Sequence, residues 1–298
     1  MTIQHGKRSN MKVAFIGVGT MGRPMAANIA KAGHELYVFD ADSARTAQVA
    51  RDVGAQALQR VADAGVADVI VTMLPDARAV RDIALGSGGI ATSARPGTIL
   101  VDMSSSQPLI TRETGAALAA KQITLIDAPV SGGLERATKG NLTIMIGSDD
   151  PAAVQKVKPL LASMGSTFFE VGGLGSGHAA KALNNVVGAS NYAVLAEALI
   201  VAERYGIDQK TLVDIVNVST GQSFVSTVVM KQFVVPRTYA TGFKVGLISK
   251  DATIAAELST QLGCDTPFIR LADQRWVAAR DALGESEDHS KAILTWKA

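Results

Sequence analysis

The sequence contains little cysteine, few aromatic residues and almost no net charge. Its single cysteine, Cys264, cannot form an intrachain disulfide, which suits a reducing compartment. The 29 lysines and arginines nearly balance the 27 aspartates and glutamates, so no charge excess favours nucleic acid or an anionic membrane as a partner. At 298 residues the chain can form one large domain or two and can bury a sizeable core.

Signals for targeting, membranes and metals are also lacking. Residues 1–10 are polar and have no apolar run of the kind found in a signal peptide, so we expect a loose tail there. No stretch of about twenty apolar residues runs without polar interruption. No spacing of ligand residues marks a metal site. The sequence therefore predicts a soluble, cytoplasmic protein with no metal and no membrane span.

A glycine-rich loop follows the first predicted strand, 12–16. Gly17, Gly19 and Gly22 fit the pattern G-x-G-x-x-G between this strand and a helix. The pattern provides a tight turn, close approach of backbone N–H groups to a pyrophosphate, and close packing of helix on strand. A glycine-rich turn that serves only packing is the alternative. The predicted dinucleotide-binding loop comprises Gly17, Val18, Gly19, Thr20, Met21 and Gly22.

An acidic residue ends the second predicted strand, 35–39. Asp40 lies about twenty residues beyond the glycine motif, where a carboxylate accepts hydrogen bonds from a ribose 2′-OH. The same carboxylate would repel a 2′-phosphate, so we expect NAD rather than NADP as the cofactor. Arg45 lies close by in the sequence and weakens that preference.

Further apolar runs alternate with helical stretches, as in a parallel sheet covered on both faces. These runs are 68–74, 98–103, 123–127, 142–146 and 167–171. Loops at the carboxyl ends of such strands border the ligand crevice, which makes Leu74, Pro75 and Ser105 candidate cofactor contacts. For a loop serine, simple turn formation is the alternative.

Ser131, Gly132 and Gly133 follow the predicted strand 123–127. Successive backbone N–H groups at Ser-Gly-Gly can converge into an anion-binding nest, and the Ser131 hydroxyl adds a donor. We expect such a loop to bind a carboxylate. A plain turn that binds no ligand is the alternative.

The segment 175–206 is typical of one long helix entered through a glycine-rich turn. No charged residue occurs between Lys181 and Glu197, so we expect burial on most of its circumference. Lys181 and Asn185 lie at i and i+4 and share one face near the helix start. Burial on an apolar face would depress the pKa of Lys181 toward the range useful for proton transfer. A lysine that reaches solvent or pairs with an acid is the alternative.

Beyond Gly206 the pattern is helical. The expected helices are 208–218, 223–233, 245–262, 267–283 and 288–296. Several begin at Asp or Ser and end at Gly, as helices commonly do. The pair Lys250-Asp251 lies in the third of them, and by itself it is typical of a solvated surface pair.

Five segments together resemble the β-hydroxyacid dehydrogenase family. They are GVGTMGRPM (17–25), DMSSSQP (102–108), DAPVSGG (127–133), GSGHAAKALNN (175–185) and GFKVGLISKD (242–251). The resemblance implies an α/β Rossmann domain with a doubly wound, mostly parallel sheet at 11–174. It further implies a long interdomain helix and an all-α C-terminal domain at 175–298, and a homodimer or homotetramer.

The resemblance also implies roles for single residues. Gly17, Gly19 and Gly22 match the pyrophosphate loop, Ser105 a cofactor-contacting threonine, and Ser131, Gly132 and Gly133 the substrate-carboxylate loop. Lys181 matches the catalytic lysine, Asn185 its partner, and Lys250 a lysine at the cofactor and substrate. Lys181 also weighs against the related imine reductases, which usually lack it.

These roles predict an oxidoreductase that transfers a hydride between NAD and a small 3-hydroxycarboxylic acid or its semialdehyde. The expected substrates are of the 3-hydroxyisobutyrate, tartronate semialdehyde/glycerate or threonate type. Lys181 would take or return the proton, Asn185 would orient the hydroxyl, and the Ser131 loop would hold the carboxylate. An imine-reductase-like enzyme of the same fold and a non-catalytic dinucleotide-binding protein are the alternatives.

Overall fold

The computed structural model describes residues 10–296. The chain divides into two compact units, one ending at Lys181 and the other beginning at Ala182. Apart from Asn10, the predicted tail 1–10 lies outside the described residues.

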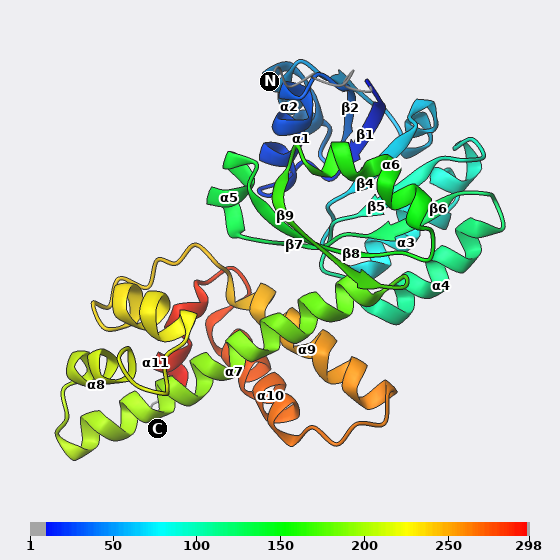
Figure 1. Cartoon of the computed structure of the whole chain (residues 1–298). Helices are drawn as coiled ribbons and strands as arrows, with labels where there is room; N and C mark the ends of the chain where they lie inside the picture. The colour runs from blue at the N-terminus through cyan, green and yellow to red at the C-terminus, as the bar shows by residue number, and fades with distance from the viewer. Residues whose placement is uncertain (1–9, 297–298) are drawn as a thin grey trace, which may run out of the picture. The chain divides into compact units, whose positions relative to one another are not determined.

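The first unit is built from alternating strands and helices (Figure 1). Its strands are β1 (Lys12–Ile16), β2 (Glu35–Phe39), β3 (Gln56–Ala57), β4 (Val69–Thr72), β5 (Ile99–Asp102), β6 (Thr124–Asp127), β7 (Val130–Ser131), β8 (Leu142–Gly147) and β9 (Gly165–Gly172). Its helices are α1 (Gly22–Lys31), α2 (Ser43–Val53), α3 (Ala77–Leu85), α4 (Pro108–Ala119), α5 (Gly133–Lys139) and α6 (Pro151–Leu161), with 3₁₀ helices η1 (Val61–Val66) and η2 (Ile90–Thr92). Each predicted strand is present, and the short β3 and β7 are additional.

The strands form one mostly parallel sheet in the order β3-β2-β1-β4-β5-β6-β8-β7, with β9 paired to β8. Strands β6 and β7 pair with β8 in antiparallel fashion. The last residues of four parallel strands lie in one row, in which Ile16 pairs with Thr72, Thr72 with Asp102, and Asp102 with Asp127. Because the chain moves outward from β1 in both directions, the carboxyl ends of β1 and β4 border the crevice where this kind of sheet binds ligands.

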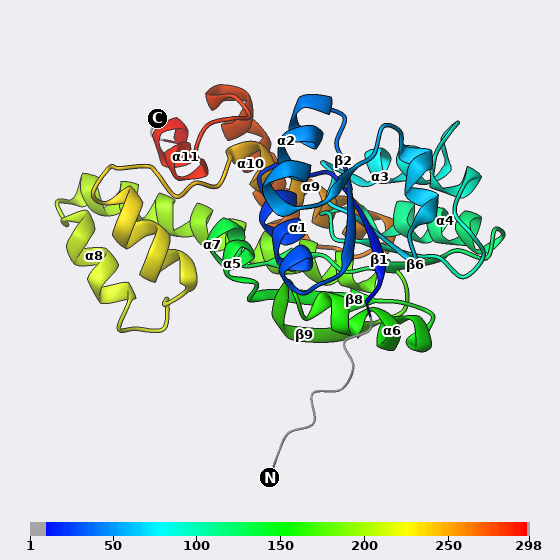
Figure 2. The same ribbon diagram turned by 90° about the horizontal axis from the view of Figure 1, so that it is seen from above.

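Helices cover both faces of this sheet (Figure 2), and a hydrophobic core lies on each face. Val13 and Phe15 of β1 point into the core that contains helices α1 and α6, whereas Ala14 and Ile16 point into the core that contains α3 and α4. This alternation follows from the two-residue period of a strand and explains why the strand sequences are apolar throughout. The doubly wound α/β fold is thereby confirmed.

Helix starts in the first unit follow the sequence signals. The carboxylates of Asp42, Asp76 and Asp150 each accept a hydrogen bond from a backbone N–H in the first turn of α2, α3 and α6. Such caps satisfy N–H groups that a helix leaves without an internal partner. These helices therefore begin where the sequence places an aspartate.

The second unit is helical. Its elements are the part of α7 (Ser176–Tyr205) beyond Lys181, α8 (Gln209–Val216), the π-helix η3 (Val225–Val234), α9 (Val245–Gln261), α10 (Pro267–Leu283), the 3₁₀ helix η4 (His289–Lys291) and α11 (Ala292–Trp296). The five predicted helical regions are present, but 223–233 is π-helical and 288–296 divides into two short pieces. Within residues 182–296 the β pairing is limited to an isolated bridge between Lys244 and Asp288.

Helix α7 is less buried than its sequence predicts. Tyr192 and Leu199 lie in the core of the second unit, but Val187 is 60% exposed, Val194 68% and Val201 67%. The expectation of burial on most of the circumference is therefore wrong, because the neighbouring helices of the unit cover one side of α7 and leave an apolar stripe on another. By length and composition alone α7 could also cross a membrane, a test that the core helix of a soluble protein passes equally.

Candidate functional site

The glycine loop between β1 and α1 has two packed glycines and one open glycine. A Cβ on Gly17 would lie 2.3 Å from the Met73 carbonyl oxygen, and one on Gly22 would lie 1.9 Å from the Gly17 carbonyl oxygen. Gly17 also has a φ of +93°, which disfavours other residues. A Cβ on Gly19 would meet nothing within 4 Å. Packing thus requires the first and third glycines, while the second leaves space for a ligand to approach the backbone.

Asp40 is tied to this loop. One of its carboxylate oxygens accepts a hydrogen bond from the Val18 N–H at 3.0 Å. The other accepts from the Asp42 N–H at 3.0 Å and from the Arg45 guanidinium at 3.1 Å. Asp40 directly follows β2 and fixes the glycine loop through Val18, a contact that the sequence did not predict.

The loops after β4 and β5 are joined directly. The Leu74 N–H donates to the Ser104 hydroxyl oxygen at 2.9 Å. The Leu74 side chain also reaches Gly17, since a Cβ there would lie 2.9 Å from its Cδ2. Leu74 and Ser105 are partly buried and Pro75 is exposed. The predicted cofactor contacts thus gather with the glycine loop at the carboxyl edge of the sheet.

The predicted substrate loop takes a form that the sequence did not indicate. Val130 and Ser131 form the short strand β7, which pairs with β8. Gly132 and Gly133 then have φ values of +137° and +65° at the start of α5. A Cβ on Gly132 would lie 2.8 Å from Arg136 side-chain atoms, whereas one on Gly133 would meet nothing within 4 Å.

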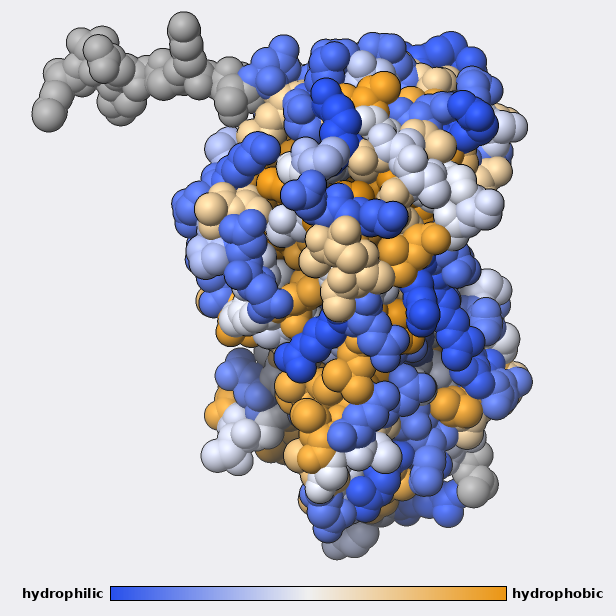
Figure 3. Space-filling model, turned by 90° about the vertical axis from the view of Figure 1, so that its right-hand side faces the viewer, coloured by the Kyte–Doolittle hydropathy of each residue, from blue (hydrophilic) through white to orange (hydrophobic). Residues whose placement is uncertain are grey.

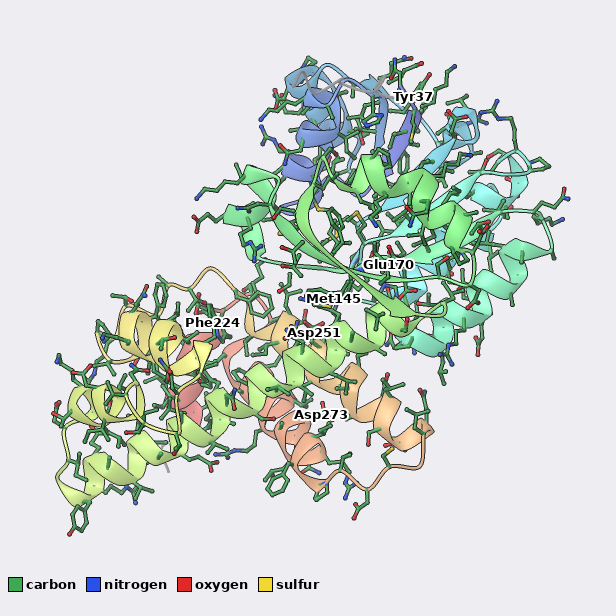
Figure 4. All side chains as sticks on the ribbon, in the orientation of Figure 1. Tyr37, Met145, Glu170, Phe224, Asp251 and Asp273 are labelled. Atoms are coloured by element: carbon green, nitrogen blue, oxygen red, sulfur yellow. The ribbon has the colours of Figure 1, made fainter. Side chains whose placement is uncertain are left out.

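Lys181 and Asn185 lie one turn apart on α7. Asn185 donates from Nδ2 to an Asp251 carboxylate oxygen of α9 at 2.6 Å, and its Oδ1 accepts from Asn184 at 3.1 Å. Asp251 is only 4% exposed, and Figure 4 shows it on α9. The pair Lys250-Asp251 is therefore not a solvated surface pair, because its aspartate is buried and holds Asn185. Sequence reasoning missed this role of Asp251, since the contact joins residues far apart in the chain.

Two family models match consecutive parts of the chain. The first, described as the NAD binding domain of 6-phosphogluconate dehydrogenase, matches residues 12–173. The second, described as NAD-binding of NADP-dependent 3-hydroxyisobutyrate dehydrogenase, matches residues 175–296. The chain belongs to the β-hydroxyacid dehydrogenase family. It is accordingly an NAD-dependent dehydrogenase that acts on hydroxyacids.

Relatives of this dehydrogenase are similar over nearly their full length. The 2-(hydroxymethyl)glutarate dehydrogenase of Eubacterium barkeri is 37% identical, over 97% of this chain and 95% of that protein. The NAD-dependent L-serine dehydrogenase of Pseudomonas aeruginosa is 36% identical, over 88% and 89%. Among solved structures, the Mycobacterium tuberculosis 3-hydroxyisobutyrate dehydrogenase with L-serine has a TM-score of 0.89 at 29% identity, covering 97% of this chain and all of that one.

The residues of the first unit of the dehydrogenase fit the cofactor of its family. The open space above Gly19 leaves backbone N–H groups accessible to a pyrophosphate, as the glycine motif requires. Asp40 has an 11% exposed side chain, so a ribose hydroxyl can still reach it. Among residues 10–296, no group of three or more His, Cys, Asp and Glu side chains is arranged to hold a metal ion.

Proposed function

We propose that the enzyme acts on carboxylic acids that carry a CH₂OH group on carbon 2. It oxidises this primary alcohol to an aldehyde, which gives the corresponding semialdehyde. The names of its relatives support this proposal. 2-(Hydroxymethyl)glutarate, L-serine and 3-hydroxyisobutyrate all contain a CH₂OH group attached to carbon 2 of a carboxylic acid. They differ only in the substituent at that carbon, so the shared hydroxyacid is the part that the proposed site must hold.

The proposed roles follow the chemistry of alcohol oxidation. Lys181 accepts the hydroxyl proton, Asn185 orients the hydroxyl through its amide, and Asp251 keeps that amide in place. Ser131, Gly132 and Gly133 hold the carboxylate, and Lys250 binds at cofactor and substrate. Bound NAD would supply the acceptor for the hydride of the carbinol carbon. The single observation that carries this proposal is that Lys181 and Asn185 lie on one face of α7 with Asn185 fixed by a buried acid.

We propose that the cofactor is bound by the glycine loop and by the loops after β4 and β5. The residues are Gly17, Val18, Gly19, Thr20, Met21, Gly22, Leu74, Pro75 and Ser105, with Asp40 at the adenosine ribose. Asp40 favours NAD over NADP because a 2′-phosphate would meet its carboxylate. Arg45 is neutralised by Asp40 and Asp42, at 3.1 and 3.4 Å, which supports this preference.

We also propose a homodimer or homotetramer in the cytoplasm. The apolar stripe on α7, defined here as Val187, Val194, Val201 and Tyr205, is 60 to 83% exposed. Exposed apolar surface of this kind is favourable to bury against a second copy. Figure 3 shows one face of the molecule, on which groups of hydrophobic residues lie among hydrophilic ones.

A panel of small acids assayed with NAD tests the proposal. We expect turnover of 2-hydroxymethyl acids, such as 3-hydroxyisobutyrate and L-serine, and none of cyclic imines with a reduced cofactor. Each substrate is assayed in both directions, since the aldehyde is reduced by the same groups. Absence of turnover with every 3-hydroxyacid, while the dinucleotide still binds, would favour the non-catalytic alternative.

A further inference from the structure

Three buried ionisable side chains of the first unit form a cluster that the proposed mechanism does not use. Asp102 ends β5, Asp127 ends β6 and His178 lies in the first turn of α7, and none of them is more than 1% exposed. The His178 Nε2 lies 3.5 Å from an Asp102 carboxylate oxygen, and its Nδ1 lies 3.8 Å from an Asp127 carboxylate oxygen. We call these three side chains the buried cluster.

Asp127 anchors the start of α7. Its two carboxylate oxygens accept hydrogen bonds from the Gly175 and His178 backbone N–H groups, both at 2.7 Å. Burial raises the pKa of Asp127, and the His178 side chain and these two N–H groups oppose that rise. Neighbouring glycines make room for the contact, since a Cβ on Gly147 would lie 2.4 Å from the carboxylate. A strand residue thus caps the helix that presents Lys181.

Asp102 holds the two loops that are proposed to contact the cofactor. One carboxylate oxygen accepts from the Thr72 hydroxyl at 2.9 Å and from the Ser104 N–H at 3.1 Å, and the other accepts from the Ser106 hydroxyl at 3.0 Å. The Ser104 hydroxyl in turn receives the Leu74 N–H. The loops after β4 and β5 are therefore fixed by one buried carboxylate.

His178 connects this carboxylate to α7. The Thr111 hydroxyl of α4 lies 3.1 Å from the Gln107 carbonyl oxygen and 2.9 Å from His178 Nδ1, with which it forms a hydrogen bond whose direction depends on the histidine tautomer. The other ring nitrogen, Nε2, has no hydrogen-bond partner within the described part of the chain and faces Asp102. Two lone pairs would repel at that distance, so the contact is attractive only with a proton between nitrogen and oxygen.

We propose that His178 is a positioning residue for Lys181. The two residues lie at i and i+3 on α7, which makes them neighbours on the helix surface. By linking this turn to Asp102, His178 keeps the Lys181 amine in a constant place relative to the loops after β4 and β5. The inference rests on the proposed function, in which Lys181 moves the substrate proton.

Three replacements of His178 separate its two nitrogens. His178→Leu removes both, His178→Asn places an amide N–H near the position of Nδ1, and His178→Gln places one near the position of Nε2. His34→Gln is the control, because His34 also belongs to the first unit but accepts a backbone N–H from Met11 at 3.3 Å. For each variant we would measure kcat, KM, the dissociation constant of NADH by fluorescence, and the melting temperature.

We expect His178→Leu to lower kcat by about tenfold or more, since a misplacement near 1 Å costs about 100-fold. NADH affinity should stay within about twofold, because Asp102 still holds both loops. His178→Gln should recover most of kcat, His178→Asn should not, and the control should equal wild type. Wild-type kcat in folded His178→Leu overturns the proposal, as does equal loss in all three variants in step with melting temperature.

A variant of Thr111 tests the same proposal if His178→Leu does not fold. Thr111→Val keeps the shape of Thr111 but removes the hydrogen-bond partner of Nδ1, so kcat should fall by about threefold, the size of one neutral hydrogen bond. Unchanged kcat in Thr111→Val contradicts the proposal. Failure of the proposed function itself would look different, because then wild type would not turn over a 3-hydroxyacid, or Lys181→Met would remain active.

Discussion

Lys181 is the side chain on which the proposed chemistry depends, and its replacement by methionine is the first prediction. Methionine keeps the length and apolar stem but cannot accept a proton, so Lys181→Met should stay folded, bind NAD and lose kcat by roughly two or more orders of magnitude. Steady-state kinetics and NADH binding measure the two effects. Lys158→Met is the control, since Lys158 forms an exposed pair with Glu170. Near wild-type turnover in Lys181→Met would leave Lys181 a structural lysine.

The second prediction is that Asp40 sets the preference for NAD over NADP. Asp40→Ser removes the charge that would repel a 2′-phosphate and releases the Arg45 guanidinium, now 3.1 Å from Asp40. The ratio of kcat/KM for NAD to that for NADP should fall by about tenfold or more, the equivalent of one charge contact worth about 1.4 kcal/mol. Overall efficiency should also drop, because the Val18 N–H loses its acceptor. Asp52→Asn, which removes a charge that pairs with Arg23 and accepts from the Gln48 amide, should leave the ratio unchanged.

Ser131 carries the third prediction, on carboxylate binding. Ser131→Ala keeps the backbone pairing of β7 and removes only the hydroxyl donor, so KM for the acid should rise by about tenfold while NADH affinity is unchanged. Gly132→Val is a poorer test of the same loop, because its side chain would meet Arg136 and its φ of +137° disfavours valine. An unchanged KM in Ser131→Ala would remove Ser131 from the substrate site.

At the scale of elements, the fourth prediction is that the exposed stripe of α7 forms the interface between subunits. Wild type should be a dimer or tetramer by light scattering. Val194→Lys should shift it toward the monomer, because a charge on the stripe would be buried in the interface at a cost of several kcal/mol. Val66→Lys is the matched control, since Val66 is an exposed valine of the first unit, on η1. A monomeric wild type, or an unchanged mass in Val194→Lys, would assign the stripe no role in association.

A second feature at this scale is how α7 is held at its start and within the second unit. Asp127 caps its first turn in the first unit, and Trp276 donates from its indole N–H to the Ala189 carbonyl oxygen at 3.1 Å in the second. Each contact fixes a part of the helix within its own unit. The boundary between the units falls inside α7, after Lys181, whereas the domain limits proposed from sequence are 11–174 and 175–298.

At the scale of the whole molecule, a buried histidine makes stability depend on pH. His289 packs among the rings of Tyr192, Trp276 and Phe243, and this burial lowers its pKa below the ordinary 6.5. Unfolded His289 binds a proton below about pH 6.5, but the folded residue does so only at lower pH. The contribution of His289 to the free energy of unfolding should therefore be constant above about pH 7 and should fall on acidification below it, by at most about 1.4 kcal/mol per pH unit.

The fifth prediction concerns a variant that lacks the His289 imidazole. His289→Asn keeps an N–H near the position of Nδ1, which lies 3.1 Å from the Phe243 carbonyl oxygen, and it does not titrate. Its unfolding free energy should decline less steeply than that of wild type between pH 6.5 and 5. Urea unfolding followed by tryptophan fluorescence reports on the second unit, which contains both tryptophans. Burial lowers the pKa of His34 in the first unit as well, so some slope should persist there. Equal slopes in the fluorescence of both proteins would contradict the prediction.

The strands, most of the helices and the place of the glycine loop follow from the local sequence. These features depend on neighbours in the chain: continuous apolar runs for buried parallel strands, aspartates at helix starts, and glycines where backbone must approach backbone. The family resemblance rested on the same local segments. Lys181 and Asn185 could be paired from sequence because helical spacing places i and i+4 on one face.

Which polar residues are buried and which apolar residues are exposed depends on tertiary packing. Asp251, Asp102 and His178 have hydrogen-bond or charge partners that lie tens of residues away in the chain, and no periodic pattern specifies such a partner. Likewise, the valines of α7 follow the same helical period whether or not a neighbouring helix covers them. Local spacing therefore determines what a segment becomes, whereas burial depends on what the rest of the chain places against it.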